Sequence, residues 1–268
     1  MSSRPRETSA PRRAGIRERA AAALAGAYFD LSYRLLVGSK AGQRLLQLTA
    51  SGDEPVHGYF TAEDRAVLLA ALAPVAGERL LDLGSGIGGI ALEMHRLAGV
   101  EIVGIDVSAS AVAAASHRAE REGVGGAVRF VQGNLARPLR INATGAYAID
   151  SLMFLPDPAR VLRAVGEELG PGRRIFATLL VFGADGGNRL VRSLRRAGMR
   201  VGRLDDVTTA LVASSKGRAN VARGLSRETT ITARGRLAMA LVLAEEYLVQ
   251  VLVGHGCAGR WRIVTWHE

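Results

Sequence analysis

The chain has 268 residues, of which 48% are hydrophobic and 22% are charged, so it can bury a sizeable core and wholesale disorder is excluded. Its 35 basic and 25 acidic residues give a net charge of +10, but nearly all the basic residues are arginines, which favours a codon bias over a surface selected to bind nucleic acid. The single cysteine, Cys257, excludes an internal disulfide framework and a cysteine-rich zinc site.

The N-terminal part of the chain is expected to form a tail followed by a helical cap. Residues 1–14 are polar and rich in arginine and proline, which predicts a disordered tail, and they lack the apolar stretch of a secretory signal, so we expect a cytoplasmic protein. Apolar residues spaced three and four apart over 16–48 predict two or three short helices. Thr61 is placed to cap a helix that runs to Leu72, and we assign 15–76 to the cap.

From residue 79 onward, predicted strands and helices alternate along the chain. Apolar runs predict six strands, at 79–83, 101–105, 128–131, 146–153, 174–181 and 199–204. The segments between most of them have helical patterning, and Ser108 and Pro158 mark two helix starts. This alternation predicts a mostly parallel sheet with helices on both faces.

The alternation stops in the segment 207–260, which has the pattern of helix, loop and helix before a last strand at 261–266. We therefore assign 77–206 and 261–268 to the core and 207–260 to a helical lid. The apolar stretch 237–253 has Glu245 and Glu246 at its centre, which argues against a membrane span and predicts a buried or cap helix.

A glycine-rich turn follows the first core strand and precedes a helix. Gly84, Gly86 and Gly89 satisfy the pattern G-x-G-x-x-G, in which glycines allow a tight turn and a close approach of backbone to ligand. The N-terminus of the next helix presents free N–H groups to an anion. By itself this turn leaves open a nicotinamide or flavin dinucleotide, S-adenosylmethionine, or no ligand.

The polar residues at the ends of the first three strands separate these cofactors. Asp82 precedes the first glycine, where a diphosphate would gain nothing from a carboxylate, and Asp106 ends the second strand, where a carboxylate can accept both ribose hydroxyls. Asn134 follows the third strand. The pattern Asp82-x-Gly84-x-Gly86-x-Gly88 closely resembles the class I S-adenosylmethionine-dependent methyltransferases, and the segments 147–157 and 162–172 resemble that family's fourth strand and its Pro-Gly turn.

The resemblance implies a Rossmann-like, mostly parallel seven-stranded sheet with helices on both faces, an antiparallel last strand and a helical cap. It implies S-adenosylmethionine as the cofactor, with Asp82 at the methionine end, Asp106 at the ribose, and Asn134, where the family usually has aspartate, at the adenine amino group. The cofactor-binding residues that we predict are Tyr28, Tyr59, Asp82, Gly84, Ser85, Gly86, Gly88, Asp106, Val107, Gly133, Asn134, Leu135 and Asp150.

The segments 27–30 and 57–60 resemble the N-terminal cap of methyltransferases that act on sterols, tocopherols, glycine derivatives and microbial secondary metabolites. We therefore expect methyl transfer to a small organic molecule in bacterial secondary metabolism, by in-line displacement under the lid, with most of the rate coming from positioning. The candidate catalytic residues are His57, His255 and Asp150, in case the acceptor must lose a proton.

Two further groups of lid residues are weighed as candidates. Glu245 and Glu246 are adjacent on a helix, so we expect at least one of them to point to solvent. The lid arginines Arg218, Arg223, Arg227, Arg234 and Arg236 could bind an anionic group of the acceptor, although an uncharged, apolar acceptor is equally allowed.

Two functions from other classes stay open. One is a methyltransferase-fold protein that catalyses a cyclisation or another non-methylating reaction, because fold does not fix function. The other, suggested by the charge of +10, is a nucleic-acid-binding protein, although the motifs of nucleic-acid methyltransferases are missing. The expected partner is a small molecule; we expect no metal, no nucleic acid and no membrane span, and a homodimer is compatible with the sequence.

Overall fold

A computed structural model describes residues 16–50, 55, 58–137 and 139–268, with side chains from residue 23 onward; the predicted tail 1–14 lies outside this part. Seven strands form one sheet in the order β3-β2-β1-β4-β5-β7-β6. Their bounds are β1 (Arg79–Leu83), β2 (Glu101–Asp106), β3 (Val128–Gln132), β4 (Gly145–Ile149), β5 (Arg174–Phe182), β6 (Met199–Asp206) and β7 (Ala258–His267). Pairing is parallel from β3 to β5, as the strand–helix alternation predicted. The strand β7 is antiparallel to both β5 and β6, as the family resemblance implied for the last strand.

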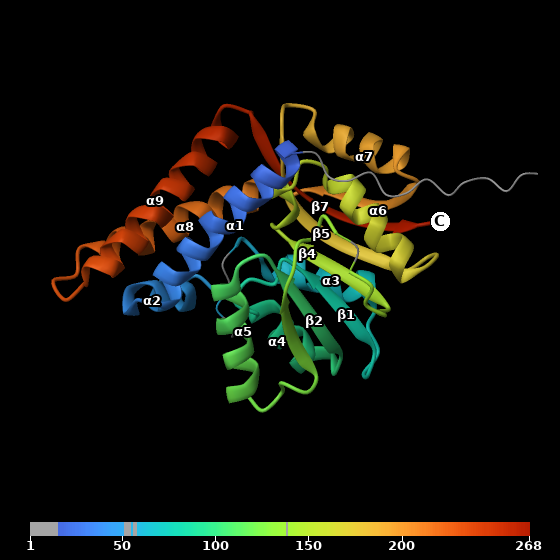
Figure 1. Ribbon diagram of the computed structural model, residues 1–268. Helices are drawn as coiled ribbons and strands as arrows, with labels where there is room; N and C mark the ends of the chain where they lie inside the picture. The colour runs from blue at the N-terminus through green and yellow to red at the C-terminus, as the bar shows by residue number, and fades with distance from the viewer. Residues whose placement is uncertain (1–15, 51–54, 56–57, 138) are drawn as a thin grey trace, which may run out of the picture.

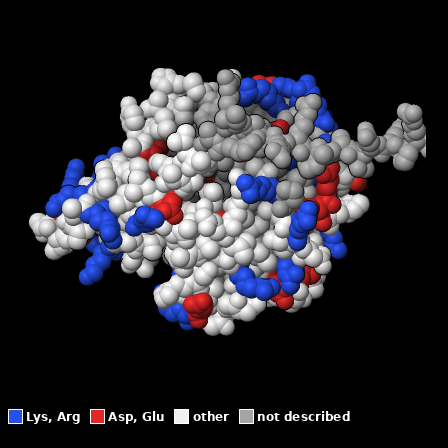
Figure 2. All heavy atoms as spheres, in the orientation of Figure 1, with Lys and Arg blue, Asp and Glu red and all other residues white. Residues whose placement is uncertain are grey.

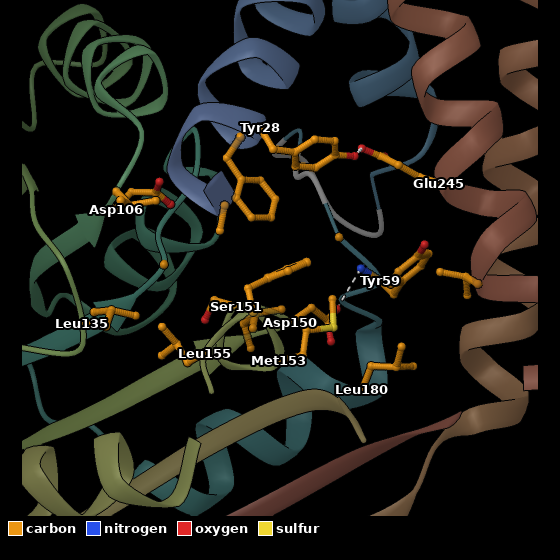
Figure 3. Close-up of a pocket in the computed structure, with 18 of the residues that line it drawn as sticks. Tyr28, Tyr59, Asp106, Leu135, Asp150, Ser151, Met153, Leu155, Leu180 and Glu245 are labelled. Carbon is orange, nitrogen blue, oxygen red and sulfur yellow. Dashed lines mark hydrogen bonds between the residues drawn. The ribbon is translucent and has the colours of Figure 1, made fainter. Parts of the chain in front are cut away.

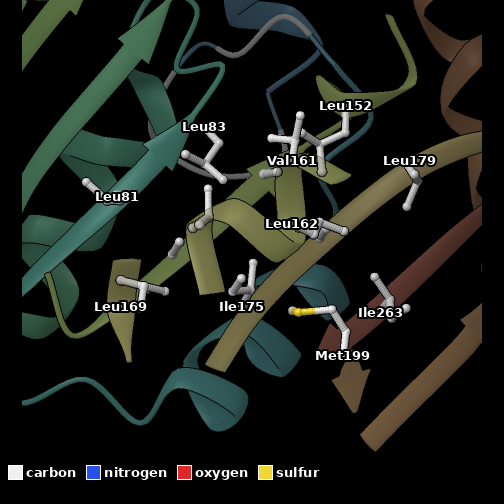
Figure 4. Packing of buried hydrophobic residues seen from close by; sticks show 14 of the residues in the cluster. Leu81, Leu83, Leu152, Val161, Leu162, Leu169, Ile175, Leu179, Met199 and Ile263 are labelled. Atoms are coloured by element: carbon white, nitrogen blue, oxygen red, sulfur yellow. The ribbon is translucent and has the colours of Figure 1, made fainter. Parts of the chain in front are cut away.

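Helices cover both faces of the sheet because successive strand residues point to opposite sides. On one face, Leu81, Ile175 and Ile263 form a cluster with residues of α6 (Pro158–Leu169), as Figure 4 shows. Residues of α7 (Gly186–Arg196) belong to the same cluster. The opposite face carries a second cluster, which packs against α3 (Ala62–Leu72), α4 (Gly89–Ala98) and α5 (Ala109–Arg121). The two clusters make the sheet a rigid platform for the loops at its edge.

The strand β4 is shorter than the sequence predicted. It ends at Ile149, whereas the apolar run continued to Met153. The reason is Asp150, whose φ of +52° turns the chain out of the sheet. The residues after it form a short 3-10 helix, η1 (Leu152–Phe154).

Four helices pack together beside the sheet and project from the core (Figure 1). They are α1 (Ile16–Val37), α2 (Lys40–Leu48), α8 (Thr208–Ser226) and α9 (Ala233–Gly254). Two N-terminal helices form where two or three short ones were predicted, and α1 ends directly before Gly38. However, α1 is long, with 22 residues, and Gly42 does not interrupt α2. Gly42 lies inside α2, where a Cβ atom would be 2.2 Å from the carbonyl oxygen of Leu36, so this glycine lets α2 pack closely against α1.

The helix α9 is a cap helix, one of the two alternatives that the sequence left open, and only one of its sides is buried. Ala238, Val242 and Glu246 are buried on one side, whereas Leu237 and Tyr247 are exposed on the other. By length and composition α9 is apolar enough to cross a membrane. Only 22% of its most apolar stretch is buried inside the protein, which is less than in the core helix of a soluble protein. A large apolar side of this helix therefore faces outward.

Candidate active site

A cavity of about 460 Å³ lies at the carboxyl ends of the parallel strands, between the sheet and the helices α1 and α9 (Figure 3). This is where ligands bind in open sheets of this type. The strand ends contribute Gly84, Asp106, Val107, Gly133, Asn134, Leu135, Ile149, Asp150 and Ser151. Helices α1, α8 and α9 contribute Ala25, Tyr28, Phe29, Tyr33, Arg218, Glu245, Leu248, Val249 and Leu252.

The glycine-rich turn is held tightly between its neighbours. Gly84 and Gly86 have φ values of +86° and +51°, which glycine adopts without strain. A Cβ atom at Gly84 would lie 2.3 Å from the Cβ of Ser151, and one at Gly86 would lie 2.6 Å from the hydroxyl of Tyr33. The backbone of Gly84 and Gly86 also lines a small side cavity of about 30 Å³, together with Asp82 and Ser85.

Asp82 is buried at the end of β1 with unsatisfied acceptor capacity. Its Oδ2 atom and the Oγ atom of Ser85 make no hydrogen bond of normal length within the described part of the chain. The nearby hydroxyl of Tyr147 partly offsets the effect of burial on this carboxyl, but it too makes no such bond. Burial raises the pKa of Asp82 to about 8, and the neighbouring charge of Asp106 adds to the rise. A cationic group in the side cavity would satisfy this carboxyl.

Asp106 is oriented by the turn that it faces. Its Oδ2 accepts a hydrogen bond of 2.8 Å from the backbone N–H of Gly86, and its Oδ1 accepts one of 2.9 Å from that of Ser108. The carboxylate therefore links β2 to the glycine-rich turn and stands fixed at the wall of the main cavity, where it could accept hydroxyl groups.

The structure places most of the predicted cofactor residues around these two cavities. Tyr28, Tyr59, Asp82, Gly84, Ser85, Gly86, Asp106, Val107, Gly133, Asn134, Leu135 and Asp150 all line one or both. Gly88 does not: it caps α4, and a Cβ atom there would lie 2.5 Å from the ring of Phe130, so its role is packing. The side-chain oxygen of Asn134 accepts a bond from Ala136 N–H at 2.9 Å, which holds the loop that would face an adenine ring.

The catalytic candidates are less well supported. Asp150 is committed to the fold, because its two oxygens accept hydrogen bonds from Arg260 Nε at 2.8 Å and Arg260 Nη2 at 3.2 Å. It also accepts from Thr178 and from the N–H of Tyr59, so it positions the loop over the cavity and is a poor general base. His255 is exposed at the C-terminal end of α9 and does not line the cavity, and His57 lies outside the described residues.

Neither lid glutamate simply points to solvent, contrary to expectation. Glu246 is buried, where it accepts a hydrogen bond of 2.6 Å from Arg218 Nε and one of 2.9 Å from the hydroxyl of Tyr59. Glu245 lines the cavity and accepts a hydrogen bond from the hydroxyl of Tyr28 (Figure 3). Burial raises the pKa of both tyrosines, so both hydroxyls stay protonated and act as donors.

The lid arginines do not form an anion site in the cavity. Arg218 lines it, but this guanidinium is paired with Glu246. The other four, Arg223, Arg227, Arg234 and Arg236, are exposed and do not line the cavity. Within the described residues, no cluster of three or more His, Cys, Asp or Glu side chains could hold a metal ion.

Sequence reasoning missed the apolar wall of the cavity, which is formed by Ile149, Met153, Phe154, Leu155, Leu180, Phe182, Leu248, Val249 and Leu252. Its α9 part had a signal, since Glu245, Leu248, Val249 and Leu252 have the spacing of one helix face. Tyr33, which packs on Gly86, was also missed; it lies five residues after Tyr28 on α1.

Comparison with known proteins identifies the core. Residues 80–172, which hold the glycine-rich turn, Asp82, Asp106 and Asn134, match the methyltransferase domain family. This match assigns residues 80–172 to a methyltransferase domain. The chain's strand order and antiparallel β7 agree with this assignment, and residues of the matched segment, among them Gly84 and Asp106, line the two cavities.

Curated relatives of this methyltransferase domain match only part of their length. Methyltransferase phqN of Penicillium fellutanum is 30% identical over 138 residues, which cover 50% of this chain and 42% of that protein. The 27-O-demethylrifamycin SV methyltransferase of Amycolatopsis mediterranei is 31% identical over 136 residues, which cover 46% of this chain and 50% of that protein. The chain thus spans half or less of the length of these two relatives.

Solved structures share the fold of this chain over most of its length. The [4+2]-cyclase SpnF has a TM-score of 0.70 and 24% identity, with 92% of this chain and 97% of that chain covered. A methyltransferase from Thiobacillus denitrificans, in complex with S-adenosyl-L-homocysteine, has a TM-score of 0.62 and 22% identity, with 84% and 98% covered. At these identities the likeness concerns the fold alone.

Proposed function

We propose that this protein transfers a methyl group from S-adenosylmethionine to a small, largely apolar acceptor of secondary metabolism. The observation that carries the proposal is the pairing of two cavities. A small one holds the buried Asp82 and Ser85 oxygens beside the glycine-rich turn, and a large, apolar one adjoins it at Gly84. The reaction class is supported by relatives named as methyltransferases, which include the 27-O-demethylrifamycin SV methyltransferase and a sterol 24-C-methyltransferase of Gibberella zeae.

In this proposal the chain's own residues hold the cofactor by its polar ends. Bound S-adenosylmethionine supplies a methyl group on a positively charged sulfur, which is a good leaving group. Asp82 accepts a hydrogen bond from the ammonium group at the methionine end, and Asp106 accepts hydrogen bonds from the ribose hydroxyls. The loop from Gly133 to Leu135 contacts the adenine ring. Bacterial origin and a cytoplasmic location are part of the proposal and rest on the sequence pattern.

The acceptor is held by the wall opposite the cofactor. Met153, Leu155 and Leu180 offer apolar contacts to it (Figure 3), and the residues of α1 and α9 cover it as a lid. Two polar pairs stand near it: Tyr28 of α1 with Glu245 of α9, which both line the cavity, and Tyr59, which lines the cavity and donates to the buried Glu246. Glu245 is the better placed base for an acceptor hydroxyl, since Glu246 already pairs with Arg218.

The cofactor assignment is tested by calorimetry with S-adenosylhomocysteine. Replacing Asp106 by Asn removes a charged acceptor, and a hydrogen bond to a charged group is worth about 1.5–3 kcal/mol, so affinity should fall by about ten- to a hundredfold. The matched control is Asp185→Asn, a surface carboxylate at the N-cap of α7, which should leave affinity unchanged. Equal affinity of the Asp106 variant and the native protein would remove the ribose assignment.

A cyclisation is the second candidate function. It is favoured by one observation, the likeness over 92% of the chain to a [4+2]-cyclase, together with an apolar cavity that could fold a flexible substrate. Incubation with methyl-labelled cofactor and apolar hydroxylated acceptors separates the two functions. Label in the product supports methyl transfer, whereas an isomerised, unlabelled product supports cyclisation.

A further inference from the structure

The outer side of α9 is an unusually apolar surface. Leu237, Ala240, Ala244, Tyr247 and Leu248 follow one another at helical spacing, and all are exposed. The exposed fractions reach 72% for Tyr247, 57% for Leu248 and 56% for Leu237. Single exposed apolar residues are ordinary, but a stripe that runs for most of a 22-residue helix indicates an interaction site.

The helix α1 extends this surface. The hydrogen bond between Tyr28 and Glu245 places α1 directly beside α9. On α1, Leu24 and Leu31 are exposed by 72% and 53% and lie one helical turn to either side of Tyr28. We call the exposed side chains of Leu24, Leu31, Leu237, Tyr247 and Leu248 the α1–α9 apolar face.

The α1–α9 apolar face reaches the large cavity. Tyr28 and Leu248 are exposed on the surface and also line the cavity, so apolar surface continues from the outside of the protein to its interior. An apolar acceptor could therefore enter or leave between α1 and α9 along this surface, past the polar pair of Tyr28 and Glu245. This link to an acceptor rests on the proposed function, whereas the face itself does not.

Basic side chains surround the far end of the same helices. Figure 2 shows them gathered on the projecting part of the molecule, around uncharged surface. Lys40, Arg223, Arg227, Arg234 and Arg236 are exposed there, and we call them the basic end. The acidic residue among them, Glu228, is paired with Arg44 at 2.7 Å. The α1–α9 apolar face thus ends in an excess of positive charge.

We propose that the α1–α9 apolar face docks on the surface of an anionic lipid bilayer, with the basic end contacting phosphate headgroups. An amphipathic helix binds a bilayer in this way when apolar side chains enter the interface and basic ones meet anionic lipid. The helix lies on the surface and does not cross, because its inner side is packed on α8 and carries the buried pair of Glu246 with Arg218.

Charge favours a bilayer over a second copy of the chain as the occupant of this face. If two copies paired with their helices parallel, the two basic ends would meet and repel each other. If the helices were antiparallel, each basic end would face the segment 254–257, Gly-His-Gly-Cys, which offers no acidic side chain. An anionic lipid surface complements both the apolar and the charged part.

The test is sedimentation of the full-length protein with vesicles of phosphatidylcholine, with or without phosphatidylglycerol. The native protein should bind the anionic vesicles at least about tenfold more strongly than the neutral ones, and salt should weaken the binding. Leu237→Ser with Tyr247→Ser should abolish binding, and Arg234→Gln with Arg236→Gln should weaken it by about tenfold or more. None of these four residues lines the cavities, so all variants should still bind S-adenosylhomocysteine, which shows that they are folded.

Two control pairs match these changes elsewhere on the surface. Val75→Ser with Leu97→Ser removes two exposed apolar side chains from the surface of the sheet domain. Arg195→Gln with Arg196→Gln removes two exposed charges from α7. Both should bind anionic vesicles like the native protein. Equal binding of all variants, or no binding of the native protein, overturns the proposal. A dimer in light scattering that the Leu237/Tyr247 variant converts to a monomer assigns the face to a second copy instead.

Discussion

Two carboxylates of the site differ in whether the fold supplies hydrogen-bond donors to their oxygens. Asp106 and Asp82 both end a strand, yet two backbone amides hold Asp106, while Asp82 is only 2% exposed and has an oxygen without a hydrogen bond of normal length among the described residues. A buried acceptor without a partner destabilises the protein unless a ligand supplies the donor. The buried carboxyl of Asp82 therefore destabilises the ligand-free protein, and a bound ligand that donates to it would remove this destabilisation.

This imbalance predicts a pH dependence of stability. The pKa of Asp82 is about 8 in the folded protein and close to 4 in the unfolded chain, so between these values the folded state holds a proton that the unfolded state has lost. The contribution of Asp82 to the free energy of unfolding therefore falls as pH rises, by up to about 1.4 kcal/mol per unit, and levels off above pH 8.

Urea unfolding from pH 5 to pH 8 without cofactor measures the effect. Asp82→Asn, which cannot ionise, should lose this downward slope and be more stable than the native protein at pH 8. The surface variant Asp185→Asn should keep the native slope. Parallel pH profiles for the native protein and the Asp82 variant would contradict the prediction.

At the scale of elements, long-range charge pairs decide details that local patterns do not contain. The capping box of Thr61 and Asp64 was readable from the sequence, and α3 begins where it predicts. The end of β4 was not readable, because Asp150 turns the chain while paired to Arg260, which lies 110 residues away. The apolar wall of the cavity was not predicted for a similar reason. Part of it comes from α9, and the position of α9 on the core depends on contacts between segments that are far apart in the sequence.

The Arg260 network predicts a large effect of one buried side chain. Arg260 joins Asp150 at the end of β4 to Asp64 at the start of α3, and all three side chains are buried. Arg260→Met should lower the free energy of unfolding by about 3–5 kcal/mol, because it leaves two buried carboxylates without this partner. Arg163→Met, which breaks the exposed pair of α6 with Glu167, should cost about 0.5 kcal/mol or less.

Urea denaturation of both variants makes this comparison. Adding Asp150→Asn to Arg260→Met should recover part of the loss, since one buried charge is removed with its partner. An Arg260 variant within about 1 kcal/mol of the native protein would show that the network contributes little to stability.

At the scale of the whole molecule, the N-terminal helix is coupled to the cofactor loops. Asp30 of α1 accepts hydrogen bonds from the N–H of Ser110 at 2.9 Å and the hydroxyl of Ser108 at 3.1 Å. These bonds hold the pKa of Asp30 below its usual value, so the carboxylate is charged at neutral pH. Because Asp106 accepts from Ser108 N–H, one short loop joins α1 to the residue that we assign to the ribose.

A ligand in the cavity should therefore order α1 as well as the strand ends. S-adenosylhomocysteine should slow hydrogen exchange in α1, where Tyr28 and Tyr33 line the cavities, and leave α7 on the other side of the core unchanged. Asp30→Ala removes the link without touching the cavity wall, so this variant should still bind the ligand while α1 gains less protection. If α1 exchanged at the same rate with and without bound ligand in the native protein, the helix would be a static cover, because a lid that closes on the cofactor must lose opening motions when the site is filled.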